Sequence, residues 1–365
     1  MNNRLTKLTN WLQAEHLDFA FISSTDNVFY LTNFHCDPHE RLLGLFVFPH
    51  EEPILVCPKM ELEQVKSAGW NYETIGYTDT DNPWKMVQQS LTKRNVNGEH
   101  LAIEIEHMNV SRYETLKTLF PHATFVPAET KLHELRMLKD KKEFAILQEA
   151  AAYADIAIDI GVSAIKEGAT ELEILAKIEY ELKKKGIHKM AFSTMVLTGA
   201  NSALPHGVPG ANKITKGDFV LFDLGVIIDG YCSDITRTVA FGHVTEQQKE
   251  IYHTVLQAEQ AAIEACKLGT LLKDLDNTAR SIITQAGYGD YFPHRLGHGL
   301  GIGVHEFPSL KSDNDMPLQE GMCFTIEPGI YVPKIGGVRI EDDIFMTNEG
   351  PHILTAYPKE LVIVS

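Results

Sequence analysis

Five residues in the second half of the sequence have the types that a pair of divalent metal ions requires: Asp223, Asp234, His298, Glu327 and Glu341. A carboxylate can bridge two ions, and an oxygen-rich set with a single nitrogen suits Mn²⁺, Co²⁺ or Zn²⁺ better than a thiolate site does. Each residue alone has an ordinary explanation as a turn, cap or loop residue. Together they predict a two-metal site, where a shared water molecule loses a proton near neutral pH and becomes a nucleophile.

The segment around the two aspartates predicts a β-hairpin. Asp223 ends an apolar run, a second β-prone run begins directly after Asp234, and Asp229-Gly230 between them is a turn signal. A turn centred between Ile228 and Asp229 would place the two aspartates directly opposite each other, whereas a turn one residue later would make them diagonal neighbours on one face. Both registers bring two like charges together, which favours a cation between them.

Glu327 and Glu341 repeat this arrangement. Each closes a β-prone run, and the connection 330–337 contains Pro333, Gly336 and Gly337. Arg339 lies two residues before Glu341, so on an alternating strand the two side chains share a face. Arg339 could therefore orient a carboxylate or contact a substrate, although balancing the surplus of carboxylates would explain it equally well.

His294 and His298 are four residues apart, a spacing that would also suit a metal-binding pair on a helix. Glycines at positions 297, 299, 301 and 303 argue against a helix there. The sequence therefore predicts a glycine-rich loop in which His298 alone is a metal ligand.

Four motifs together resemble those of the dinuclear metallopeptidases of the pita-bread fold, a group that contains methionine aminopeptidase, aminopeptidase P and prolidase. They are residues 206–209 (HGVP), 298–306 (HGLGIGVHE), 327–331 (EPGIY) and 337–342 (GVRIED). The order Asp, Asp, His, Glu, Glu also resembles that of the family, and all five ligand positions are kept. The resemblance is strong over residues 135–365 and looser before them.

This resemblance implies an α+β protein of two domains. A C-terminal pita-bread catalytic domain, residues 135–365, would follow an α/β creatinase-like N-terminal domain, residues 1–128. The resemblance also implies two divalent metal ions per chain, with Mn²⁺ ahead of Co²⁺ and Zn²⁺, and a homodimer.

The resemblance further assigns roles on the substrate side of the site. His206 and His305 would donate hydrogen bonds to the oxyanion that forms when hydroxide attacks a peptide carbonyl. Glu327 would be both a metal ligand and the carrier of a proton from water to the leaving nitrogen. His294 would lock its loop or contact the substrate. Without the resemblance, a histidine before glycine, such as His206, is more often a structural loop residue.

Proline specificity follows from the resemblance, not from residue chemistry. The two-domain layout and the glycine-rich motif are similar to those of prolidase, which cleaves Xaa-Pro dipeptides, and of aminopeptidase P, which removes the first residue of longer Xaa-Pro peptides. The compact length favours the dipeptidase, so small peptides with proline at the second position are the expected substrates. A metal-free creatinase-like hydrolase or a non-catalytic peptide-binding or scaffold protein would be expected to have lost ligands.

Composition sets outer bounds on function. A chain of 365 residues has room for about two domains. Its 49 acidic and 33 basic residues give a net charge of −16, which argues against nucleic acid and anionic membranes as partners. Five cysteines without CxxC spacing indicate reduced thiols of a cytoplasmic protein. No apolar leader or long apolar stretch is present, so neither export nor a membrane span is expected.

The elements that must position the site follow from the spacing of apolar residues. In the N-terminal part, this spacing predicts strands near residues 18–22, 43–48, 53–57 and 101–104. It predicts helices near residues 3–15, 59–67, 84–93 and 111–119. After a junction at 132–140, one long helix is expected, followed by helices near 170–185, 245–267 and 271–286. Strands between and after these helices would form a curved sheet that carries the ligands on its inner face.

Overall fold

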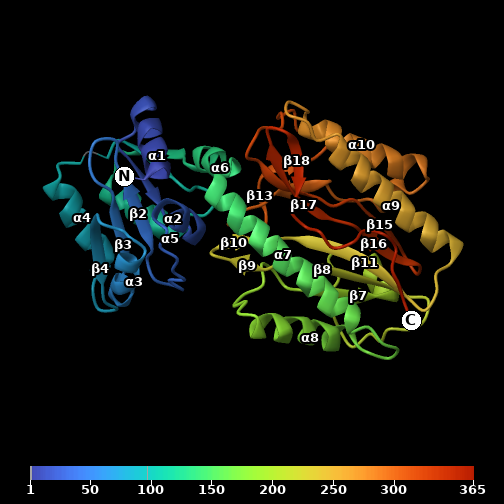
Figure 1. Cartoon of the computed structure of the whole chain (residues 1–365). Helices are drawn as coiled ribbons and strands as arrows, with labels where there is room; N and C mark the ends of the chain where they lie inside the picture. Colours follow the sequence, from blue (N-terminus) through green and yellow to red (C-terminus); the bar gives the residue numbers. More distant parts are fainter. Residues whose placement is uncertain (1, 97) are drawn as a thin grey trace. The chain divides into compact units, whose positions relative to one another are not determined.

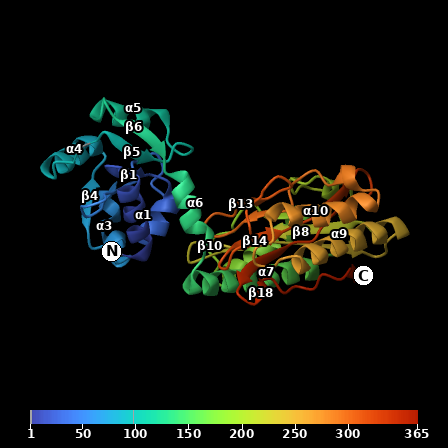
Figure 2. The same cartoon turned by 90° about the horizontal axis from the view of Figure 1, so that it is seen from above.

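The computed structural model describes residues 2–96 and 98–365, which group into two compact units. One unit ends at Arg136 and the other runs from Met137 to Ser365 (Figures 1 and 2). The domain bounds predicted above, 1–128 and 135–365, stay predictions.

The N-terminal unit is built around a six-stranded mixed sheet in the order β4-β3-β2-β1-β5-β6. Phe19, Phe21 and Phe46 are fully buried in its core. The strands are β1 (Phe19–Ile22), β2 (Gly44–Val47), β3 (Ile54–Pro58), β4 (Glu73–Tyr77), β5 (His100–Ile103) and β6 (Thr124–Pro127). The helices are α1 (Asn3–Ala14), α2 (Thr25–Thr32), η1 (Lys59–Glu61), α3 (Leu62–Ser67), α4 (Pro83–Lys93), α5 (Val110–Leu119) and α6 (Glu129–Met137).

Four elements of this unit are absent from the sequence prediction: α2, α6, β4 and β6, of which α6 overlaps the segment predicted as a junction. The strands β4 and β6 form the two edges of the sheet, so several of their side chains are partly or fully exposed and neither strand has a continuous apolar run. Helix α2 has only eight residues, and its start depends on the side chain of Ser24, which accepts a hydrogen bond from the N–H of Asn27 at 3.3 Å.

The C-terminal unit contains the four helices that the sequence predicts. They are α7 (Lys141–Ser163), α8 (Glu171–Lys184), α9 (Glu246–Glu264) and α10 (Leu272–Gln285). Capping boxes begin α7, α8 and α9, with Asp140, Thr170 and Thr245 as the capping residues. These local signals explain why the helix starts could be predicted to within a few residues.

Strands fill the space between two helix pairs in this unit (Figure 1). Apolar side chains of α7 and α8 pack against the sheet β19-β11-β8-β7, and those of α9 and α10 pack against β13-β12-β14-β17-β18 and the hairpin β15-β16. The strands are β7 (Met195–Thr198), β8 (Phe219–Leu224), β9 (Ile227–Ile228), β10 (Tyr231–Cys232), β11 (Ile235–Phe241), β12 (Gly297–Gly299), β13 (Glu306–Leu310), β14 (Cys323–Ile326), β15 (Gly329–Val332), β16 (Gly336–Arg339), β17 (Asp342–Thr347), β18 (Gly350–Ile353) and β19 (Ile363–Val364). Two short 3₁₀ turns are η2 (Gly199–Ala203) and η3 (Gly289–Tyr291).

Candidate metal centre

Strands β8 and β11 position the two aspartates. Their register pairs Asp223 with Thr236, so Asp234 lies diagonally across from Asp223. The turn falls at Asp229 and Gly230, whose φ angles of 46° and 83° lie in the left-handed region that a tight hairpin turn requires. Of the two registers that the sequence allows, the structure has the one with the later turn.

The two arms of this hairpin approach each other closely beside the aspartates. A Cβ atom at Gly225 would lie 1.8 Å from the carbonyl oxygen of Ser233, far inside van der Waals contact. Only glycine fits at position 225 without moving a strand. Gly225 therefore sets the separation of the arms that carry Asp223 and Asp234.

The two glutamates come from a second pair of strands. Ile326 of β14 pairs with Asp342 of β17, and the same register continues into β15 and β16. Glu327 and Glu341 follow β14 and precede β17, so they face each other in the gap between the two pairings. Each hairpin thus presents two carboxylates to the same region.

A buried polar seam joins the two carboxylate-bearing segments. The N–H of Glu341 donates to the carbonyl oxygen of Thr236 at 3.1 Å, and the Thr236 hydroxyl donates to Oε2 of Glu341 at 2.5 Å. Arg237, which is 1% exposed, donates to the carbonyl oxygen of Glu341 at 2.5 Å and to the carboxylate of Asp342 at 2.6 Å. The seam fixes the position of one hairpin against the other.

His298 lies on the short strand β12, so the prediction of a glycine-rich loop at this residue is wrong. A Cβ atom at Gly297 would lie 2.0 Å from the carbonyl oxygen of Thr325, and one at Gly299 would lie 2.4 Å from that of Phe307. The glycines that suggested a loop instead allow the neighbouring backbones to pack closely around the histidine.

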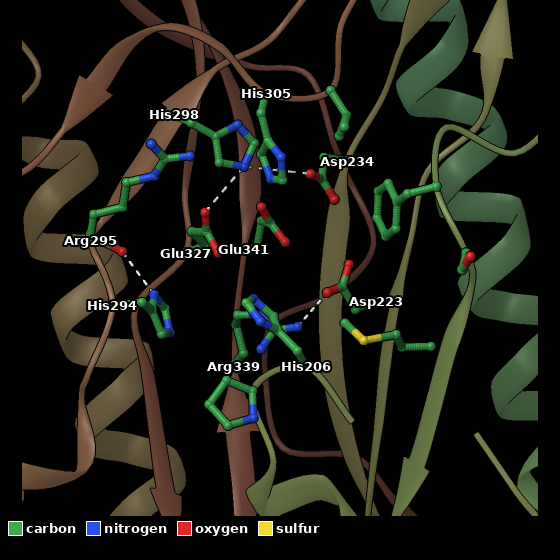
Figure 3. Close-up of a pocket in the computed structure, with 15 residues that line it drawn as sticks. His206, Asp223, Asp234, His294, Arg295, His298, His305, Glu327, Arg339 and Glu341 are labelled. Carbon is green, nitrogen blue, oxygen red and sulfur yellow. Dashed lines mark hydrogen bonds and ion pairs between the residues drawn. The ribbon is translucent and has the colours of Figure 1, made fainter. Parts of the chain in front are cut away.

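Five side chains converge between the strands (Figure 3). The ligand atoms of Asp234, His298 and Glu341 all lie within 4.8 Å of one another. Nε2 of His298 is 3.3 Å from Oε1 of Glu327 and 3.8 Å from Oδ2 of Asp234. Asp223 completes the set from the diagonal position on β8.

The electrostatics of this cluster fit divalent cations. Burial, together with the neighbouring carboxylates, raises the pKa of Asp234 and of Glu341 well above its usual range. Burial also opposes ionisation of Glu327, but the hydrogen bond and charge of His298 lower the pKa of Glu327 to about 2. Within the described residues, Oδ1 of Asp234 is buried and has no hydrogen-bond partner. Buried oxygen donors that repel one another are stabilised by positive charge, and carboxylate oxygen suits a hard divalent ion.

Arg339 begins a hydrogen-bonded chain behind Asp223. Its guanidinium donates to the carboxylate of Asp223 and, at 2.7 Å, to the hydroxyl oxygen of Tyr331. The Tyr331 hydroxyl lies 2.8 Å from Nε2 of His294, and Nδ1 of His294 lies 2.8 Å from the carbonyl oxygen of Arg295. A carbonyl can only accept, so Nδ1 carries the proton and Nε2 accepts from Tyr331. Arg339 orients a carboxylate in this structure, and both ring nitrogens of His294 are engaged.

A pocket of about 550 Å³ opens beside the cluster. The rings of His298 and His305 meet edge to face with centroids 4.3 Å apart, and burial lowers the pKa of His305 to about 4, so its imidazole is neutral at pH 7. Every site residue predicted from the sequence lines this pocket: His206, Asp223, Asp234, His294, His298, His305, Glu327, Arg339 and Glu341.

Six further residues line the pocket and were not predicted: Phe192, Ser193, Met195, Pro205, Arg295 and Val304. Pro205, Arg295 and Val304 are direct neighbours of predicted histidines, so their positions in the sequence could have suggested them. The segment from Phe192 to Met195 carries no such signal, because tertiary packing alone brings it to the site.

Two general properties of the described residues bear on the sequence predictions. All five cysteines are buried and free of disulfide bonds. None of the described helices combines the length and the apolar character needed to cross a membrane.

Comparisons with known proteins agree at the levels of sequence and structure. Residues 145–348 match the metallopeptidase family M24, and residues 4–138 match the creatinase/prolidase N-terminal domain. YkvY of Bacillus subtilis (strain 168), provisionally named a dipeptidase, is 57% identical over 362 residues, which cover 99% of this chain and 100% of YkvY.

Two solved structures share the fold. The Xaa-Pro dipeptidase from Bacillus anthracis is 34% identical, with a TM-score of 0.92 and coverage of 99% of each chain. The prolidase from Pyrococcus horikoshii OT3 is 37% identical, with a TM-score of 0.91 and coverage of 99% of this chain and 100% of its own. The predicted α+β class, with a creatinase-like N-terminal domain before a pita-bread domain, is confirmed. With both family matches and full-length relatives in agreement, this chain belongs to the metallopeptidase family M24.

Proposed function

We propose that this metallopeptidase hydrolyses the peptide bond that precedes proline, with Xaa-Pro dipeptides as its substrates. One observation carries the proposal: the two Asp, one His and two Glu residues converge on one pocket, in a chain that matches an Xaa-Pro dipeptidase and a prolidase over nearly its full length. A pocket of about 550 Å³ is of a size for a small peptide.

We propose that two divalent ions are held by the five acidic and histidine side chains and that Mn²⁺ is the native metal. The carboxylate-rich donor set with one imidazole supports this choice. When bound, the ions would supply Lewis acidity and a water molecule of lowered pKa. The proposed ligands are Asp223, Asp234, His298, Glu327 and Glu341.

The remaining residues of the site have proposed roles that match their surroundings. His305 is neutral at pH 7 and can donate one N–H to the oxyanion that develops on the substrate carbonyl. His206 would donate from the opposite wall. Glu327, whose carboxylate lies 3.3 Å from the His298 imidazole in the pocket, would accept a proton from water and pass it to the leaving nitrogen. Arg339 would hold Asp223 directly, and His294 would support Arg339 through Tyr331.

A comparison of substrates tests the proposed function. Purified protein would be assayed with an Xaa-Pro dipeptide and with the matching Xaa-Pro-Xaa tripeptide, in the presence of Mn²⁺, Co²⁺ or Zn²⁺ added separately. Higher kcat/KM on the dipeptide, with Mn²⁺ giving the highest rate, supports the proposal. Higher kcat/KM on the tripeptide would assign an aminopeptidase P activity instead. Full activity after chelation would favour a metal-free, creatinase-like reaction.

Replacement of His305 by alanine is expected to keep the metal and lower kcat by roughly 10²–10³, the usual cost of one oxyanion donor. Metal content by elemental analysis and kcat on an Xaa-Pro dipeptide would be measured together. The exposed His253 of α9 offers a matched control, since His253→Ala removes the same side chain from outside the pocket. Loss of metal along with activity in His305→Ala would make His305 a ligand.

We also propose that the protein acts in the cytoplasm as a homodimer. Five free, buried cysteines support a reducing compartment. Light scattering on the purified protein would give the mass, and a monomer of 40.9 kDa would exclude the dimer.

A further inference from the structure

His206 lies at the tip of a loop that offers its side chain little support. The His206 loop, residues 199–210, begins with the 3₁₀ turn η2 and leads His206 into the pocket (Figure 3). His206 is exposed, and the flanking Leu204 and Val208 are 55% and 80% exposed. These exposed side chains give the imidazole little support, so its position depends on how the backbone of the loop is held.

One buried carboxylate accepts hydrogen bonds from both ends of this loop. Glu171, fully buried in the first turn of α8, accepts from the N–H of Thr198 at 2.7 Å, directly before the loop, and from the N–H of Gly210 at 2.8 Å, at its end. The amide of Asn201 donates to both Glu171 oxygens, at 2.9 and 3.0 Å, and the amide of Asn212 donates at 3.1 Å. Four amide groups of the loop and its flanks thus meet on one side chain.

The backbone between these anchor points is packed tightly, so its ends determine where the tip lies. A Cβ atom at Gly207 would lie 2.7 Å from Cδ1 of Leu197. On the other side, the Ser202 hydroxyl accepts from the N–H of Gly337 at 2.9 Å, and a Cβ atom at Gly337 would lie 2.0 Å from the carbonyl oxygen of Ser202. A shift at either end would be transmitted to His206 instead of being absorbed along the way.

We propose that Glu171 is a positioning residue that fixes the imidazole of His206 by holding both ends of the His206 loop. This inference rests on the proposed function, in which His206 faces the substrate. A buried carboxylate is costly unless it is fully hydrogen-bonded, and the amide donors together with the N-terminus of α8 supply that stabilisation. In Glu171→Gln, an NH₂ group that donates hydrogen bonds would replace a carboxylate oxygen that accepts them. This NH₂ group would face the amide donors of the loop, so at least one end of the loop would lose its hydrogen bond.

The test compares Glu171→Gln with Glu173→Gln. Glu173 lies in the same helical turn and carries the same charge, but within the part of the chain that the structure describes its carboxylate bonds only to Thr170, in the capping box. Both variants remove a negative charge from the first turn of α8, but only Glu171→Gln also removes hydrogen bonds to the His206 loop. With an Xaa-Pro dipeptide, kcat/KM is expected to fall on the order of 10- to 100-fold in Glu171→Gln, the range for a displaced catalytic group. Glu173→Gln should stay close to wild type, and both should keep the metal.

Two further measurements separate positioning from a general loss of stability. Hydrogen exchange at Gly207 and Gly210 should accelerate in Glu171→Gln and not in Glu173→Gln. In a His206→Ala background, Glu171→Gln should cause little additional loss, because its effect acts through the imidazole. Equal kcat/KM in the two glutamine variants, or full additivity with His206→Ala, would overturn the inference. An inactive wild-type protein would instead overturn the proposed function, and the exchange measurement would still report whether Glu171 holds the loop.

Discussion

Replacing Asp234 with alanine is expected to remove at least one metal ion per chain and to lower kcat/KM by roughly 10³ or more, since the electrostatic stabilisation that metals supply is worth several kcal/mol. A ligand atom of Asp234 lies within 4.8 Å of those of both His298 and Glu341. Oδ1 of Asp234 is one of the buried side-chain oxygens that lack a hydrogen bond among the described residues. Elemental analysis of metal-loaded, desalted protein, together with dipeptide assays, provides the measurement.

The unfolding temperatures of the metal-free proteins show whether Asp234→Ala is correctly folded. Burial and the neighbouring carboxylates raise the pKa of Asp234, so its ionised form destabilises the metal-free fold at neutral pH. Metal-free Asp234→Ala should therefore unfold at the same temperature as the metal-free wild type, or higher. Added Mn²⁺ should raise the melting temperature of the wild type much more than that of the variant. A variant with full activity and full metal content would contradict the dinuclear site.

Replacing Gly225 with alanine is expected to damage both stability and metal binding. The new Cβ atom would lie 1.8 Å from the carbonyl oxygen of Ser233, and backbone atoms cannot rotate away as a side chain can. Overpacking commonly costs about 1–3 kcal/mol, and a loss of about 3 kcal/mol corresponds to a drop of roughly 6–12 °C in melting temperature. Because the arms of the hairpin must separate, Asp223 and Asp234 should also lose metal affinity.

Gly210→Ala is the matched control for this substitution. A Cβ atom at Gly210 would meet only Oε2 of Glu171, at an ordinary contact distance of 3.9 Å. Its melting temperature and metal content should remain near those of the wild type. If Gly225→Ala had the same values as this control, the hairpin would be more adaptable than its close backbone contact indicates.

Local signals account for what could be predicted from the sequence. The Asp229-Gly230 turn limits the first hairpin to two registers, and one of them places Asp223 and Asp234 as the structure does. Capping residues and apolar spacing locate the long helices. The family motifs supply the remaining site residues, and all of them line one pocket.

Features that depend on distant backbone could not be predicted. The glycines beside His298 look like loop residues until Thr325 and Phe307 are seen packed against them. The link from Arg339 to His294 passes through Tyr331, which ends the motif 327–331 but whose hydrogen bonds to these two residues are not encoded in that motif. In the sequence, Glu171 has the position of an ordinary acidic residue in the first turn of a helix. Its hydrogen bonds to the His206 loop form only when the chain is folded.

The seam between Thr236 and Glu341 has a consequence for how the protein is made. These residues are 105 positions apart, and Glu341 directly precedes β17. A growing chain that has left the ribosome only as far as β11 already contains Asp223 and Asp234, but it lacks the histidine and both glutamates. Domains fold as units during synthesis, so the complete set of proposed ligands exists only after Glu341 has been added, and metal capture would follow the synthesis of both hairpins.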